Sequence, residues 1–241
     1  MIRVLLPSVI AGLATCFGAL LILSLKKFSV KSLALLLGLS AGIMSGIVLF
    51  DLLPSAWMFG NLITAVTGFG TGLAVLLLLD RLITWLTPAP PERRAQQELL
   101  NMGYLIATGI ALHDLPEGMA IAVGFAATAK LGGLIALAIG LHNIPEGMAT
   151  AAPLRMGGLR RWRIFYLNLL ISLFTPLGTL LGLILVSISR DFIGILLALA
   201  AGAMVYIVCC ELVPTACRYH LTMAVTGVTG GLLFAIFLSL L

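Results

Sequence analysis

Long apolar stretches alternate with short polar connections along the whole chain. Each stretch approaches the roughly 20 residues that a helix needs to cross a bilayer. The eight expected spans lie at about 2–25, 32–53, 61–86, 100–126, 130–152, 164–188, 192–216 and 220–240. This pattern predicts an all-α integral membrane protein with eight transmembrane helices in a single domain, residues 1–241. The first stretch is interpreted as a retained helix, because no A-x-A-like cleavage signal follows it.

Composition excludes an ordinary soluble protein. Hydrophobic residues make up 61% of the chain and charged residues 10%, against about 45–50% and about 25% in soluble domains. The net charge of +5 matters less than its distribution. With the N-terminus outside, the cytoplasmic connections carry Lys26, Lys27, Lys31, Arg81, Arg93, Arg94, Arg155, Arg160, Arg161, Arg163 and Arg218, and the outer side carries Arg3, Lys130 and Arg190. The positive-inside rule therefore predicts a multi-pass membrane protein with both termini outside.

The smaller features are consistent with this topology. The Pro-rich polar segment 87–97 is expected to be a short cytoplasmic connection. The four cysteines lack zinc-ribbon spacing, so small buried hydrophobes are favoured over metal ligands. The membrane topology explains why the loops are basic, so no nucleic-acid partner is expected.

The chain repeats itself at an offset of 160. Residues 41–56 align with 201–216, with eight of the 16 positions identical, and Asp51 corresponds to Glu211. An odd number of crossings separates the two copies, so they have opposite orientation. This predicts a 3+2+3 inverted repeat: repeat 1 at about 2–86, two central helices at about 100–152 and repeat 2 at about 164–240. Such plans usually belong to transporters with a midplane site; duplication without a transport role is the alternative.

Two copies of a polar motif lie inside the central helices. They read His113-Asp114-Leu115-Pro116-Glu117-Gly118 and His142-Asn143-Ile144-Pro145-Glu146-Gly147. Positions i and i+4 share a helix face, so each His points the same way as its Glu. A lone His could serve as a hydrogen bond between helices, but the doubled pattern indicates a divalent-metal site. Asp114 and Asn143 lie about 100° around from their histidines and are expected to reach a second, adjacent position.

The second motif resembles the signature of the ZIP family (Zrt/Irt-like divalent-metal transporters), and the first resembles its partner in the fourth helix. The resemblance covers essentially the whole chain, and it implies a location in the plasma or inner membrane of a prokaryotic cell. It implies a binuclear centre between the second, fourth, fifth and sixth helices, and movement of Zn²⁺ or related ions toward the cytoplasm. It implies these metal ligands: His113, Glu117, His142, Glu146, Asn143 for the second position, and Met44, which lines the first position in some members. From the residues alone, Met44 is more readily an apolar filler of the core than a metal ligand.

Two positions depart from the family pattern. Asp114 stands where many prokaryotic members have Asn, and Thr175 stands where many have Glu. A carboxylate is thus lost from the sixth helix and gained on the fourth. The exchange bears on whether the centre holds one or two metals.

Asp51 and Glu211 are assigned separately. The predicted topology places Asp51 toward the outer face and Glu211 toward the cytoplasm. We interpret them as ligands at the entrance and exit of the route. The alternative is a solvated helix end beside Pro54 and Pro214.

Transport of divalent cations is therefore the expected function. An intramembrane metalloenzyme or a metal-selective channel with the same ligands is the alternative, although the chain has no H-E-x-x-H motif. Zn²⁺ is the first expected substrate, with Fe²⁺, Mn²⁺, Co²⁺ and Cd²⁺ as further candidates that ligand type alone does not separate. The metal is cargo and no cofactor is expected. The expected partners are divalent metal ions and the lipid bilayer, and a homodimer is one assembly that the sequence leaves open.

Overall fold

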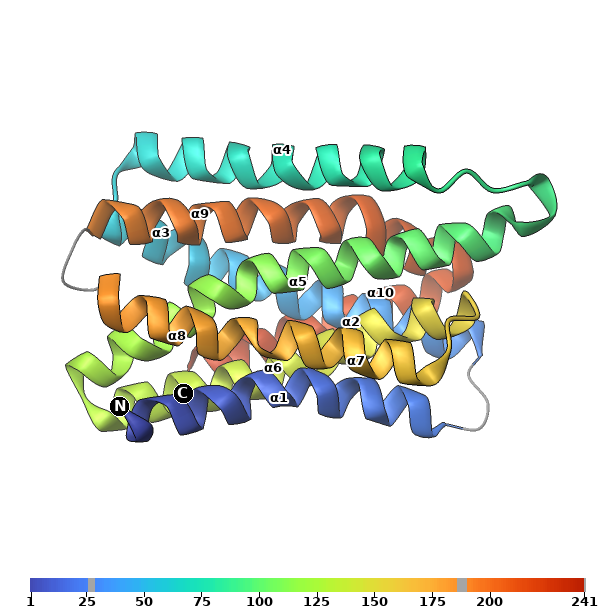
Figure 1. Ribbon diagram of the computed structural model, residues 1–241. Coiled ribbons are helices and arrows are strands. Elements are labelled where there is room, and N and C mark those ends of the chain that lie inside the picture. Colours follow the sequence, from blue (N-terminus) through green and yellow to red (C-terminus); the bar gives the residue numbers. More distant parts are fainter. Residues whose placement is uncertain (26–28, 186–189, 241) are drawn as a thin grey trace.

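A computed structural model describes residues 1–25, 29–185 and 190–240. Over these residues every regular element is a helix, as predicted (Figure 1). Lys26 and Lys27, which entered the topology argument, lie outside the described residues.

The helices follow the apolar stretches closely. In chain order they are α1 (Ile2–Ser24), α2 (Val30–Ile47), η1 (Val48–Leu52), α3 (Leu53–Phe59), α4 (Leu62–Leu86), η2 (Pro91–Arg93), α5 (Arg94–Ala127), α6 (Ala129–Met156), α7 (Arg161–Ser172), α8 (Phe174–Leu185), α9 (Arg190–Tyr206), η3 (Ile207–Leu212) and α10 (Val213–Ser239). Two short elements, η1 and η3, are π-helical turns, and η2 is a 3₁₀ turn.

Five stretches of the described chain are long and apolar enough to cross a membrane. They are Ile2–Ser24, Val30–Phe59, Leu62–Leu86, Arg161–Ile184 and Phe192–Ser239. The last has 48 residues, or about 72 Å at 1.5 Å per residue, more than twice the hydrocarbon thickness of about 30 Å. It bends at His220, where the backbone leaves helical geometry. The helices α5 and α6 have 34 and 28 residues, but they carry the polar motifs.

Two boundaries differ from the sequence prediction. The connection expected over 87–97 is shorter, because α5 begins at Arg94. The stretch expected as one helix from 164 to 188 is interrupted at Leu173, between α7 and α8. Pro176 causes this interruption, since it offers no N–H to the carbonyl of Ser172.

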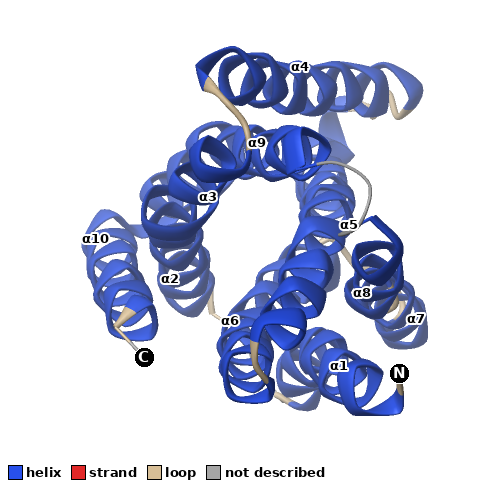
Figure 2. Ribbon diagram, turned by 90° about the vertical axis from the view of Figure 1, so that its left-hand side faces the viewer, coloured by secondary structure: helices blue, strands red, loops and turns tan. Residues whose placement is uncertain are grey.

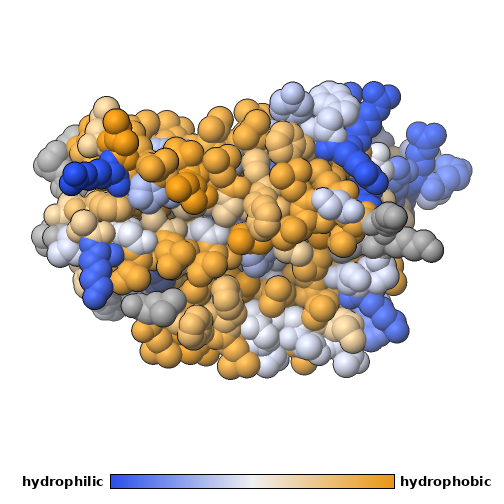
Figure 3. Space-filling view, turned by 90° about the horizontal axis from the view of Figure 1, so that it is seen from below, coloured by the Kyte–Doolittle hydropathy of each residue, from blue (hydrophilic) through white to orange (hydrophobic). Residues whose placement is uncertain are grey.

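The helices run side by side along one axis and fall into two groups. In one group α5 packs against α6 and α8, and α6 packs against α1; in the other, α2 packs against α10 and α4 against α9 (Figure 2). The start of α1 and the end of α10 lie at the same end of the bundle (Figure 1). Apolar side chains cover the middle of the face shown in Figure 3, and hydrophilic ones gather toward its two ends. This surface suits a bilayer.

The closest helix contacts follow the 160-residue repeat. A Cβ added at Gly42 in α2 would lie 2.1 Å from the carbonyl oxygen of Val228 in α10. A Cβ added at Gly202 in α9 would lie 2.0 Å from the carbonyl oxygen of Phe69 in α4. The glycines differ by 160 in number and their partners by 159. The α2–α10 and α4–α9 contacts are thus two copies of one interface, and both need glycine.

The contacts around the central helices repeat in the same way. A Cβ at Gly18 in α1 would lie 2.0 Å from the carbonyl oxygen of Ile144 in α6, and a Cβ at Gly178 in α8 would lie 2.1 Å from that of Leu115 in α5. The glycines again differ by 160, and their partners differ by 29, the offset between the two motifs. The helix pair α1–α6 therefore corresponds to α8–α5.

Candidate metal centre

Both polar motifs lie in the interior of α5 and α6, which form an antiparallel hairpin. Thr128 forms the turn, and its side chain accepts a hydrogen bond from the N–H of Leu131 at the start of α6. This N-cap fixes where the second helix begins. Positions whose numbers add up to 259 then face each other across the hairpin. The register brings each histidine opposite the glutamate of the other motif.

The two motifs are joined by crossed His–Glu pairs. His113 Nε2 lies 3.2 Å from Glu146 Oε2, and His142 Nε2 lies 3.0 Å from Glu117 Oε1. All four residues are at most 5% exposed. The shared face within each motif, predicted from the i,i+4 spacing, is therefore the face that meets the other motif.

Asp114 joins one of these pairs. Its Oδ1 lies 3.7 Å from His113 Nε2. Potential ligand atoms of His113, Asp114 and Glu146 all lie within 4.8 Å of one another, and all three residues are buried. The sequence analysis expected Asp114 to reach a second ion position adjacent to that of His113, and this assignment stays a prediction. The structure shows that the Asp114 carboxylate lies close to His113 and Glu146.

Several oxygens of the cluster make no hydrogen bond to the described residues. They are Asp114 Oδ1 and Oδ2, Glu117 Oε2, Asn143 Oδ1 and Glu146 Oε1, together with His113 Nδ1. A buried acceptor without a partner costs about 1–3 kcal/mol, and more when it is charged. Carboxylate and amide oxygens beside imidazole nitrogens form a donor set that suits a divalent transition metal.

Asn143 is held by its amide nitrogen. Its Nδ2 donates to the carbonyl oxygen of Ala11 in α1 at 3.1 Å. The bond fixes the side chain and leaves Oδ1, its acceptor, unpartnered. Asn143 is therefore oriented as an oxygen ligand would be, although no described contact joins it to the His–Glu pairs.

Thr175 lies against the first motif. A Cβ at Gly118 would lie 2.0 Å from the carbonyl oxygen of Thr175, so α8 touches α5 at this point. The Thr175 hydroxyl is fully buried and unpartnered in the described structure. The sixth predicted span thus approaches the centre at the residue where relatives were expected to carry Glu.

Met44 lies in the apolar core, 1% exposed. One turn before it on α2, Ser40 donates to the carbonyl oxygen of Pro145 at 3.0 Å, so α2 crosses α6 at the second motif. No described contact joins Met44 to the cluster. Its assignment as a ligand stays a prediction.

Asp51 lies in the π-helical turn η1, at the end of the bundle where α6 begins. A cavity of about 270 Å³ is lined by Asp51 and, further in, by His142. The centre is therefore reached from this end. Ser55 donates to Asp51 Oδ1 at 3.5 Å.

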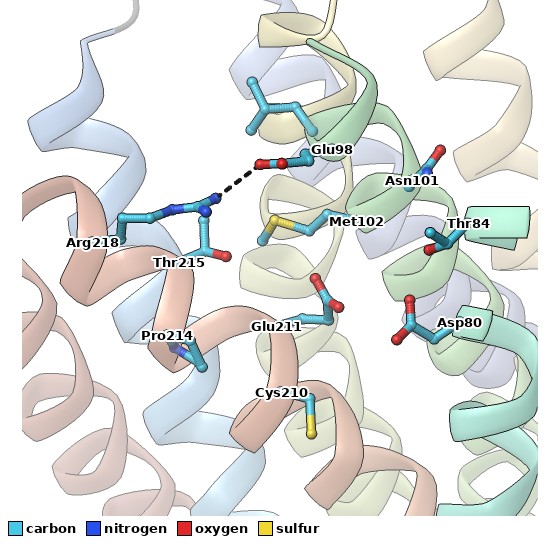
Figure 4. Close-up of a pocket in the computed structure, with 11 residues that line it drawn as sticks. Asp80, Thr84, Glu98, Asn101, Met102, Cys210, Glu211, Pro214, Thr215 and Arg218 are labelled. Atoms are coloured by element: carbon cyan, nitrogen blue, oxygen red, sulfur yellow. Dashed lines mark ion pairs between the residues drawn. The ribbon is translucent and has the colours of Figure 1, made fainter. Parts of the chain in front are cut away.

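Glu211 lies in the corresponding turn η3 and lines a cavity of about 300 Å³ toward the other end. Figure 4 shows its carboxylate and that of Asp80 pointing toward one another, and the ion pair of Arg218 with Glu98 at 3.5 Å. Asp80 also accepts a hydrogen bond from the Tyr206 hydroxyl at 2.8 Å. The sequence analysis missed Asp80, although an acidic residue within an apolar stretch is itself a signal.

Comparison with known proteins gives a consistent result. The family model described as ZIP Zinc transporter matches residues 89–239. The zinc transporter ZupT of Chlorobium luteolum is 36% identical, over 95% of this chain and 93% of its own. The proteins of that name from Corynebacterium glutamicum and Oceanobacillus iheyensis are 37% and 36% identical, over 86% and 100% of this chain and 86% and 98% of their own.

Proposed function

The chain belongs to the ZIP family of zinc transporters, and from this membership we propose that it carries divalent transition-metal cations across the membrane toward the cytoplasm, with Zn²⁺ as the first substrate. Membership places it among transporters and not among enzymes. Several oxygens and imidazole nitrogens must replace the water around a divalent ion before it can cross. The α5–α6 hairpin provides such groups where the chain is otherwise apolar.

The observation that carries the proposal is the pair of crossed His–Glu contacts with unpartnered oxygens beside them. We assign one ion position to His113, Asp114 and Glu146, whose ligand atoms lie together. Glu117 and His142 form the second group of ligands. Two further residues complete the proposed set: Asn143 as an oxygen ligand and Met44 as a lining residue.

The proposed topology has eight crossings in one domain, with a 3+2+3 inverted repeat and both termini outside. The matched glycine contacts support the repeat, since the α2–α10 and α1–α6 interfaces of one copy recur as α9–α4 and α8–α5 in the other. The length and bend of Phe192–Ser239 support two crossings there. The start of α1 and the end of α10 lie at the same end of the bundle, which supports an even number of membrane crossings.

Asp51 and Glu211 are proposed as entrance and exit ligands on this route. Each lines a cavity, and the two cavities lie toward opposite ends of the bundle. Apolar side chains such as Leu105 and Ile106, at most 1% exposed, fill the space between the centre and the Glu211 cavity. This packing favours a carrier that opens one end at a time over a continuous channel.

Purified protein in liposomes loaded with a metal-sensitive dye tests the proposal. We expect saturable Zn²⁺ uptake, reduced by Fe²⁺, Mn²⁺ or Cd²⁺ when these compete for the same site. The variant Glu92→Gln, which changes an exposed residue of η2, should transport like the parent. No metal uptake by correctly inserted protein would refute the proposed function, and uptake that does not saturate would favour the channel.

A further inference from the structure

The two cavities differ in depth. The cavity beside Asp51 extends to His142. Among the described residues that line the cavity beside Glu211, none belongs to the two polar motifs. The structure is therefore open at one end of the route and closed at the other.

The repeat shows which residues close it. The open cavity has these residues of α6 in its wall: Leu131, Leu134, Ile135, Ala138, Ile139 and His142. Subtracting 29 gives their counterparts in α5: Met102, Leu105, Ile106, Gly109, Ile110 and His113. Of these six α5 residues, only Met102 lines the cavity beside Glu211. Leu105, Ile106 and Ile110 are at most 1% exposed. They are therefore packed in the interior, whereas the corresponding α6 residues border the open cavity.

The contact that completes this closure is between η3 and α5. A Cβ added at Gly109 would lie 2.0 Å from Ile207 Cδ1 and 3.6 Å from Leu76 Cδ1. Ile207 and Leu76 are both fully buried. The Ile207 side chain can sit over α5 at this depth because position 109 has no side chain.

The counterpart of this contact is not closed. Ile207 corresponds to Ile47 at the offset of 160, and Gly109 corresponds to Ala138 at the offset of 29. Both Ile47 and Ala138 line the open cavity. Ala138 carries a methyl group that Gly109 lacks. This methyl group lies where the Ile47 side chain would have to pack to form the matching contact.

We propose that the difference between Gly109 and Ala138 sets which end of the transporter is open at rest. Ile207 on Gly109 holds an apolar seal of Leu76, Leu105, Ile106 and Ile110 shut, and the Ala138 methyl keeps Ile47 from forming the matching seal. A constriction lined only by apolar side chains excludes a hydrated ion. This inference rests on the proposed transport function, because only a carrier needs two such states.

Cysteine reporters at two matched isoleucines test the proposal. Ile106→Cys and Ile135→Cys occupy counterpart positions, one sealed and one in the open cavity. Each is placed in the full-length chain without its four native cysteines, and a hydrophilic maleimide is applied from both sides, so that the topology does not affect the result. In the parent, Ile135→Cys should react faster than Ile106→Cys.

Exchanging the two small residues should then reverse this order. In the double variant Gly109→Ala, Ala138→Gly, the ratio of the two labelling rates should fall at least about tenfold, since a minor state is commonly 0.1–10% populated. Each single variant should shift the ratio in the same direction by less. Gly133→Ala is the matched control, because a Cβ at Gly133 in α6 would meet nothing within 4 Å and the ratio should stay at the parent value.

The outcomes separate this inference from the proposed function. Equal labelling of both reporters in the parent, or an unchanged ratio in monodisperse exchange variants, would overturn the inference even if Zn²⁺ uptake is normal. A reversed ratio in a protein that transports no metal would support the two states and refute the transport function.

Discussion

Replacing Asp114 with Asn tests the charge of the centre with almost no change of shape. Asp114 is fully buried, 3.7 Å from His113 Nε2, and neither of its oxygens makes a hydrogen bond in the described structure. In the metal-free protein its charge is costly in itself and repels Glu117 and Glu146. We therefore expect metal-free Asp114→Asn to unfold at a higher temperature than the parent. With metal bound, the same charge is a ligand, so the effect should reverse.

The expected loss of Zn²⁺ affinity in Asp114→Asn is large, because the Asp114 oxygens have no other partner in the described structure. Mutation of a group that only supports a metal ligand typically costs about 10–100-fold in metal affinity, and a direct ligand without a substitute should cost about the upper end of that range. The Kd for Zn²⁺ should therefore rise about 100-fold. At a free Zn²⁺ concentration of 100 times the parent Kd, bound metal stabilises the parent by about 2.7 kcal/mol and the variant by only about 0.4 kcal/mol.

Thermal unfolding in detergent, with and without Zn²⁺, measures both effects, and bound metal per chain is determined on the same samples. Glu92→Gln, an exposed carboxylate on η2, serves as the control and should leave both the metal-induced shift and the stoichiometry unchanged. If Asp114→Asn keeps the full metal-induced shift and the metal content of the parent, Asp114 is not a ligand.

A second substitution tests whether the carboxylate can be moved. Thr175 lies in α8 against Gly118, next to the first motif. Adding Thr175→Glu to Asp114→Asn should restore part of the metal bound per chain and part of the uptake, because it returns one negative charge to the centre from the neighbouring helix. A double variant no better than Asp114→Asn would show that α8 does not contribute to the centre.

Four further outcomes follow from the same geometry. Glu117→Ala or Glu146→Ala should abolish uptake in protein that still elutes as a folded species; normal uptake by both would exclude the crossed pairs as the site. In a background lacking the native cysteines, Asp51→Cys should react with impermeant reagents only from outside and Glu211→Cys only from the cytoplasm; labelling of both variants from the same side would contradict the topology. Lowering the pH from about 7.5 to about 5.5 should reduce uptake, and higher Zn²⁺ should restore it, because protons compete for imidazole. Gly147→Ala should lower thermal stability and metal binding, since the added Cβ would lie 1.9 Å from a backbone oxygen of α1; an unchanged unfolding temperature would argue against that contact.

Much of the site could be predicted from the sequence because it depends on one helical hairpin. The spacing of His and Glu within each motif sets their common face, and the short turn at Thr128 sets the register between α5 and α6. Both are local properties of the chain. The apolar stretches and the repeat likewise indicated the helices and which of them correspond.

Only the tertiary structure decided the features that depend on helices far apart in the sequence. The sequence did not show that the ligand atoms of Asp114 lie together with those of His113 and Glu146, which the packing of α5 on α6 brings about. The hydrogen bond from Tyr206 to Asp80 and the difference in depth between the two cavities were not predicted. Helix periodicity predicts which residues share a face of one helix. The distance between side chains on different helices depends instead on how closely the two backbones approach. Here that approach depends on glycines such as Gly109, which leaves room for the Ile207 side chain over α5.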